Sequence, residues 1–110
     1  MTSRIVGRWR IVGSEAWNQD DLDLVEPATI EFGADRLGRF RLIAVEGDLD
    51  ARFVERDGLP AVEFSWDGFD ELDPASGRGW AVLGADGALR GRIFFHRGDD
   101  SEFWAERLTK

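Results

Sequence analysis

The chain has 110 residues, a formal net charge of −8 and no cysteine, which excludes disulfides, thiolate metal sites and cysteine nucleophiles. A hydrophobic fraction of 43% favours one folded domain over residues 1–110 rather than a disordered chain. An acidic chain repels phosphate backbones and anionic lipids, so we expect no nucleic-acid partner and no membrane partner. We find neither an apolar run of membrane-spanning length nor the apolar core of a signal peptide, which predicts a cytoplasmic protein.

The first third of the chain alternates apolar and polar residues in short segments. Residues 4–14 follow this alternation and predict a first strand. Asn18 stands before an acidic stretch, which predicts a helix N-cap and a short helical turn that Pro27 ends. Residues 28–32 predict a second strand, and a glycine-containing loop follows over 33–38.

Residues 39–66 carry two tight-turn signals that end in glycine, at 46–47 and at 57–58. Because glycine accepts the positive φ of a hairpin turn, these signals predict three antiparallel strands. The first turn pairs Phe40 with Phe53, and the second turn places Phe53 on the same face of the shared strand. The two registers therefore agree on which side chains point inward.

The last part of the chain begins with the longest predicted connection, residues 67–78, which is rich in acids, glycine and proline. A third turn signal at 86–87 pairs Trp80 with Ile93 and so places both side chains inside. We expect the remaining strands at 79–84, 89–96 and 102–108.

These segments give eight short strands, each connected to the next without a crossover helix. Sequential antiparallel strands in this number predict an all-β protein, an eight-stranded up-and-down (meander) barrel with a short helical turn between strands one and two. Closure of the barrel removes the two edges that a flat sheet would expose.

Gly7-Arg8-Trp9, near the start of the first strand, resembles the Gly-x-Trp signature of the lipocalin and wider calycin families. In those barrels the tryptophan closes one end, and an arginine from the end of the last strand packs across its ring. The resemblance implies that Gly7, Trp9 and Arg107 form such a plug here, and that the barrel carries a ligand. It covers two short motifs and the strand order, because the chain lacks the Thr-Asp-Tyr motif and the C-terminal helix. As a whole the chain resembles a small bacterial barrel family of unknown function.

Strand alternation places most of the acidic loops at one end of the barrel, which we call the mouth. The inward residues expected nearest to the mouth are Trp66, Trp80, Phe95 and Phe103, with the small Ala44 opposite. This arrangement predicts an aromatic-walled cup with an acidic rim, suited to a small amphipathic or cationic ligand. The alternative, which the small volume of an eight-stranded barrel favours, is that these rings simply fill the upper core.

Catalysis and metal binding have little support in the sequence. His96 is the only histidine, and its neighbours on one exposed hairpin cannot align a nucleophile, a base and an orienting group. We therefore predict that the protein is not an enzyme, and we assign no cofactor. The acids of the 67–78 loop offer oxygens to a cation without matching the EF-hand spacing, so we assign no metal site. These acids recur every three residues: Asp67, Asp70 and Asp73.

One aromatic pair is expected on the outer surface. Pairing Phe95 with Phe103 makes Phe94 and Trp104 face each other outside the barrel. Adjacent exposed aromatic residues are typical of an interface, so a homodimer or a partner-binding surface is the second functional hypothesis. The alternative is that the apolar residues of 22–25 fold back over the pair. A filled barrel that acts through this surface would need no small-molecule ligand.

Overall fold

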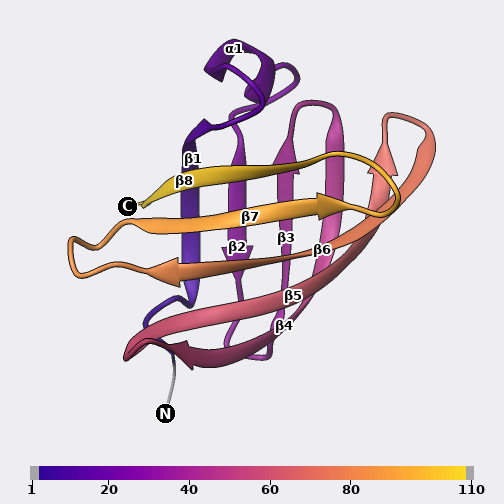
Figure 1. Cartoon of the computed structure of the whole chain (residues 1–110). Helices are drawn as coiled ribbons and strands as arrows, with labels where there is room; N and C mark the ends of the chain where they lie inside the picture. The colour runs from indigo at the N-terminus through magenta and orange to yellow at the C-terminus, as the bar shows by residue number, and fades with distance from the viewer. Residues whose placement is uncertain (1–2, 109–110) are drawn as a thin grey trace.

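The computed structural model describes residues 3–108, and these form a closed antiparallel barrel in which each strand pairs with the next along the chain (Figure 1). The expected all-β, up-and-down barrel with a helical turn between the first two strands is confirmed. The elements are β1 (Gly7–Ser14), α1 (Gln19–Leu22), β2 (Thr29–Phe32), β3 (Leu37–Leu42), β4 (Val45–Arg56), β5 (Leu59–Asp70), β6 (Asp73–Leu83), β7 (Leu89–Phe95) and β8 (Asp100–Arg107).

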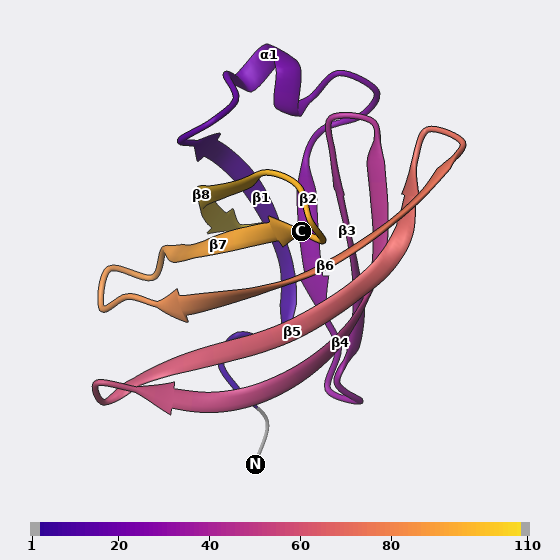
Figure 2. The same cartoon turned by 45° about the vertical axis from the view of Figure 1, so that its right-hand side comes forward.

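The barrel is flattened into two layers. In Figure 1, β1, β2 and β3 run vertically at the back, β5 to β8 cross them in front, and α1 lies above the upper end of β1. Figure 2 shows the long β4–β5 hairpin curving around one side to connect the two layers. Within residues 3–108, the structure contains no helix of the length and hydrophobicity needed to cross a membrane.

The β4–β5 hairpin has the register that its turn signal predicts. Asp57 and Gly58 occupy the turn with φ values of 52° and 78°, the positive values that a two-residue hairpin turn requires. Phe53 therefore pairs with Val62 across the two strands. This hairpin sets which faces of β4 and β5 point inward.

The β3–β4 turn lies at Ile43 and Ala44, so the turn predicted at 46–47 is wrong. Phe40 pairs with Gly47 instead of Phe53, a displacement of six positions. Because six is an even number, the alternation of inward and outward side chains in β4 is preserved.

Gly47 serves ring packing rather than a turn. A Cβ atom at this position would lie 2.9 Å from ring carbons of both Phe40 and Trp66. These two rings make an edge contact with centroids 4.9 Å apart. The turn falls instead at Ile43, whose φ of 57° is uncommon for a β-branched residue and which local turn chemistry does not predict.

The predicted 67–78 loop is also wrong, because β5 and β6 continue through it and turn at residues 71–72. Its glycines allow close contacts within the sheet: a Cβ atom at Gly77 would lie 2.7 Å from the Nε1 atom of Trp66. The glycine and proline residues that indicate a loop in the sequence therefore lie inside strands.

The β6–β7 hairpin differs from the predicted register by one residue, and this moves Trp80 to the outer face. A loop over residues 84–88 joins the strands, and Leu83 pairs with Leu89 across it. Trp80 therefore pairs with Arg92, while Ala81 beside it is fully buried. A one-residue shift exchanges the two faces of a strand, so the predicted inward position of Trp80 is wrong.

The β7–β8 hairpin corrects the predicted aromatic pair. Phe94 pairs with Asp100 and Trp104 pairs with Arg90, so the two rings lie four positions apart along the strands. Phe94 and Trp104 therefore do not face each other across the hairpin.

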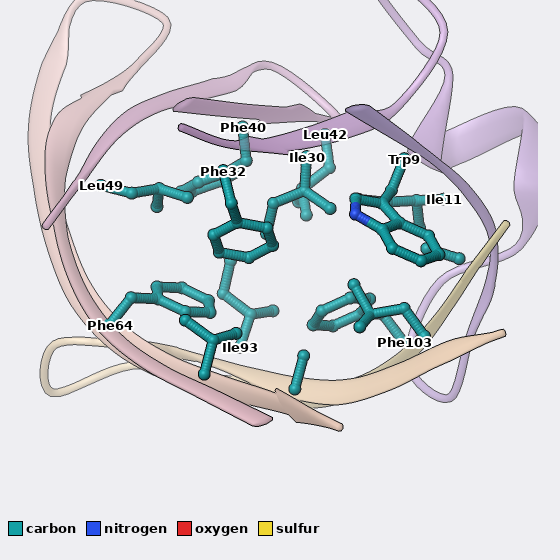
Figure 3. Packing of buried hydrophobic residues seen from close by; sticks show 14 of the residues in the cluster. Trp9, Ile11, Ile30, Phe32, Phe40, Leu42, Leu49, Phe64, Ile93 and Phe103 are labelled. Atoms are coloured by element: carbon teal, nitrogen blue, oxygen red, sulfur yellow. The ribbon is translucent and has the colours of Figure 1, made fainter. Parts of the chain in front are cut away.

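The space between the two layers is filled with apolar side chains (Figure 3). Trp9, Phe32 and Phe103 are almost completely buried, and the Phe32 and Phe64 rings pack with centroids 5.8 Å apart. Close packing of this kind is what an eight-stranded barrel of this size can hold.

Candidate functional site

At one end of the barrel, Trp9 and Arg107 form a stacked pair. The guanidinium of Arg107 lies 4.2 Å from the centroid of the Trp9 ring, and the indole N–H of Trp9 donates to the carbonyl of Ile5 at 2.9 Å. Gly7 has a φ of 134°, and a Cβ atom there would meet the Nη1 atom of Arg107. The structure thus brings together the three residues that the resemblance implies.

At the other end, α1 covers the barrel. The side chain of Asn18 accepts a hydrogen bond from the amide of Asp21 at 2.9 Å, which starts the helix as predicted. Leu22 is fully buried, and its carbonyl accepts a hydrogen bond from the amide of Ile43 at 2.7 Å. The helix is therefore attached to the β3–β4 turn beneath it.

An ion pair fastens the segment that follows α1 to the wall of the barrel. Arg10 on β1 donates two hydrogen bonds to the carboxylate of Asp23, at 2.6 and 2.8 Å. The same carboxylate accepts from the amide of Ala28 at 2.8 Å and from the side chain of Gln19 at 3.1 Å. The hydrogen bond from Arg10 holds the pKa of Asp23 well below its usual range, although partial burial opposes the shift.

Two of the aromatic residues expected to wall a cup, Trp66 and Phe95, pack against each other, and Trp17 joins them. Trp66 lies 5.2 Å from Phe95 between ring centroids, and Phe95 lies 6.2 Å from Trp17. Trp66 is 3% exposed and Phe103 is 2% exposed. Rings that pack edge to face in this way cover part of each other's surface, so less of that surface is left for a ligand.

Two of the residues predicted for the cup lie elsewhere. Ala44 lies in the β3–β4 turn, and Trp80 lies on the outer face of β6. The structure therefore brings Trp66 and Phe95 together at the mouth and separates Trp80 from both.

An open hollow of about 520 Å³ lies on the outer face of β4 to β7, and we call it the outer groove. The register places its side chains in two rows that cross the strands. The first row is Arg52, Glu63 and Trp80, and the second row is Asp50, Ser65, Arg78 and Phe94. Arg56 completes the groove at one end, and the backbone of Gly79 contributes to its floor.

Arginine side chains stack on the aromatic rings of the outer groove. The guanidinium of Arg56 lies 4.9 Å from the Trp80 centroid, and that of Arg78 lies 5.3 Å from the Phe94 centroid. Each contact places a guanidinium carbon over a partly exposed aromatic ring, which is a cation–π pair. Trp104 has a similar partner in Arg90, outside the groove.

Sequence reasoning missed the outer groove because it placed Trp80 inside. The register between β4 and β5 correctly aligns Arg52 with Glu63 on the outer face. In the observed register of β6, Trp80 pairs with Glu63 and so extends this row. A signal that the sequence does offer is the outward position of Arg52 in a chain in which lysine is almost absent.

Neither His96 nor the acids at residues 67, 70 and 73 line the outer groove. His96 is exposed in the β7–β8 turn, where its amide donates to the carbonyl of Ser76 at 2.7 Å. Among the described residues, no three histidine, aspartate or glutamate side chains come together as ligands for a metal ion.

Comparison of the chain with protein-family models, with curated proteins and with solved structures finds no significant match. The closed eight-stranded antiparallel barrel is consistent with a lipocalin-like barrel.

Proposed function

We propose that this protein is a binding protein that acts through the outer groove and performs no catalysis. The observation that carries the proposal is the contrast between the two faces of the sheet. The inward side chains of β4 and β5 are buried, whereas the groove on their outer face is open and lined by arginine and aromatic side chains. This is a modified form of the surface hypothesis, with Trp80 in place of Trp104 as the partner of Phe94.

The packing of the interior supports the use of the outer face. Glycine is required where the core rings approach neighbouring strands, because a Cβ atom at Gly79 would meet the ring of Phe64 and one at Gly47 would meet the ring of Phe40. Where a single methyl group does not fit, a ligand would have to displace core side chains.

The composition of the outer groove also supports the proposal. Binding surfaces are enriched in aromatic residues and arginine relative to the rest of a protein surface. Trp80, Phe94 and three arginines meet here, in a chain whose net charge is −8. A concave site with apolar faces and a few directed polar groups is the usual form of a small-molecule site.

A second candidate is a small amphipathic or cationic ligand bound at the mouth, as in a lipocalin-like carrier. The observation that favours it is the cluster formed by Trp17, Trp66 and Phe95, in which Trp17 stands two residues before the four-residue helix α1. In this case α1 would move aside, breaking the hydrogen bond between Ile43 and Leu22. Membership of the lipocalin family, supported by the contact of Trp9 with Arg107, is part of this candidate.

The two candidates are separated by mapping where small fragments bind. A library of cationic, anionic and neutral fragments is titrated into ¹⁵N-labelled protein, and amide shifts are followed. We expect saturable shifts at Ser65 and Arg78 that Trp80→Leu abolishes and the matched Trp104→Leu does not. Shifts confined to α1 and Phe95 would favour the mouth, and the absence of shifts at the outer groove would contradict the proposal.

A further inference from the structure

The charge balance of the outer groove differs from that of the whole chain. Three guanidinium groups meet two carboxylates in the groove, although the chain carries a net charge of −8. The outer groove is thus a local excess of positive charge on an acidic protein, and such a surface attracts small anions.

Within this groove, Arg78 is the guanidinium left without an anion. Asp50 pairs with Arg52 at 2.9 Å, and Glu63 pairs with Arg56 at 3.7 Å. Arg78 contacts the face of Phe94 instead, and the residue opposite it in β5 is Ser65. A guanidinium stacked on a ring keeps its in-plane N–H groups for another partner, in a geometry that suits the two oxygens of a phosphate or carboxylate.

Trp80 supplies an apolar surface beside Arg78. It lies two residues further along β6, on the same outer face. Its ring is half-buried and contacts Arg56. A flat ligand can pack against the exposed part of this ring while its charged group reaches Arg78, because residues two apart on a strand lie on one face.

From these contacts we infer that the outer groove binds a small molecule in which a flat ring carries one oxyanion, a phosphate or a carboxylate. The inference rests on the proposed function and names its ligand class. Arg78 binds the oxyanion, the hydroxyl of Ser65 offers a further donor, and Trp80 packs on the ring. A nucleic-acid strand is disfavoured as the occupant, because its phosphates would meet the acidic remainder of the surface.

The test is an NMR titration of ¹⁵N-labelled protein with matched probes. Phenyl phosphate and benzoate carry both the ring and the oxyanion. Inorganic phosphate lacks the ring, benzyl alcohol lacks the charge, and benzylamine reverses it. We expect phenyl phosphate or benzoate to shift the amides of Ser65 and Arg78 at lower concentration than the other three probes. Whichever of phenyl phosphate and benzoate binds with the lower Kd shows whether the groove prefers a phosphate or a carboxylate.

Variants assign the roles of the two residues. Arg78→Gln removes the charged donor. It should lower the affinity for the tighter-binding anionic probe about tenfold and leave the affinity for benzyl alcohol unchanged. Trp80→Leu should lower the affinity for the same probe about fivefold and leave the affinity for inorganic phosphate unchanged. Arg39→Gln, at an exposed arginine on β3, and Trp104→Leu are the controls, and each should bind as the parent does. Melting curves verify that every variant folds.

The outcomes separate this inference from the proposed function. Tighter binding of benzylamine, or an Arg78→Gln variant that binds phenyl phosphate and benzoate as well as the parent does, would overturn the ligand class while the groove remained a binding site. Equal affinity for inorganic phosphate and phenyl phosphate would overturn the role of the ring. If no probe shifts the groove, the proposed function fails as well. A dimer whose interface covers Trp80 would replace the small molecule by a second copy of the chain.

Discussion

The guanidinium of Arg107, near the end of β8, lies 4.2 Å from the ring of Trp9 on β1 and donates a hydrogen bond to the carbonyl of Val6 at 3.0 Å. It also donates to the carbonyl of Arg4. One side chain therefore connects the last strand to the segment that precedes the first. These contacts add to the backbone pairing of β1 with β8, which closes the barrel.

Replacing Arg107 by alanine should lower the free energy of unfolding by about 1–2 kcal/mol, because a cation–π contact and hydrogen bonds to backbone carbonyls are lost together. Urea denaturation measures the change. Arg39→Ala, at an exposed arginine elsewhere, is the control and should change little. Equal stability of the two variants would mean that the stacked pair contributes nothing measurable.

Replacing Gly47 by alanine should destabilise the protein by about 1–3 kcal/mol, because its methyl group would meet the rings of Phe40 and Trp66. The loss should be smaller in a Phe40→Leu background, where one of the two rings is absent. Thermal melts of the four proteins of this cycle give the coupling between the two sites. A cost independent of residue 40 would show that Gly47 is required for another reason.

Gly47 also shows why the register was only partly predictable. The sequence offers Glu46-Gly47 as a turn, but the glycine is needed for contact between rings brought together from different strands. A glycine that is required by tertiary packing in this way leaves no pattern in the neighbouring sequence. The inward and outward faces of β4 are nevertheless predicted correctly, because its register on β3 differs from the predicted one by an even number of residues.

Trp80 shows the opposite case. The β6–β7 loop is longer than the two-residue turn that Asp86-Gly87 suggests, since the amide of Gly84 bonds the carbonyl of Ala88 at 2.9 Å across it. The register of β6 on β7 therefore differs from the predicted one by one residue, and this exchanges the inward and outward faces of β6. As a result, Trp80 lines the outer groove instead of the predicted cup. The fold depends on strand number and order and could be predicted, whereas the site depends on the exact pairing of one hairpin.

The pH dependence of stability should report the ion pair of Arg10 with Asp23. Because the hydrogen bond from Arg10 lowers the pKa of Asp23 in the folded state, the contribution is fully present above the unfolded value of about 3.9. It is lost as the pH falls below that value. The loss continues until the pH reaches the lowered pKa of folded Asp23, so Asp23→Asn should cost about 1 kcal/mol at pH 7, after allowance for solvent screening, and clearly less at pH 2.

Denaturation of the parent and of Asp23→Asn between pH 7 and pH 2 tests this expectation. Asp70→Asn, at an exposed carboxylate, serves as the control and should follow the parent at each pH. A constant difference between the parent and Asp23→Asn across this range would contradict the assigned protonation behaviour.

The account depends most on the side of the barrel to which Trp80 belongs, and solvent access to the indole groups tests this most directly. A soluble paramagnetic agent is added to ¹⁵N-labelled protein, and the indole signals are followed, each assigned by replacing one tryptophan at a time. We predict strong attenuation of Trp80 and Trp104, with Trp9 and Trp66 protected by burial. A Trp80 signal as protected as that of Trp66 would contradict the register of β6 and remove the outer groove.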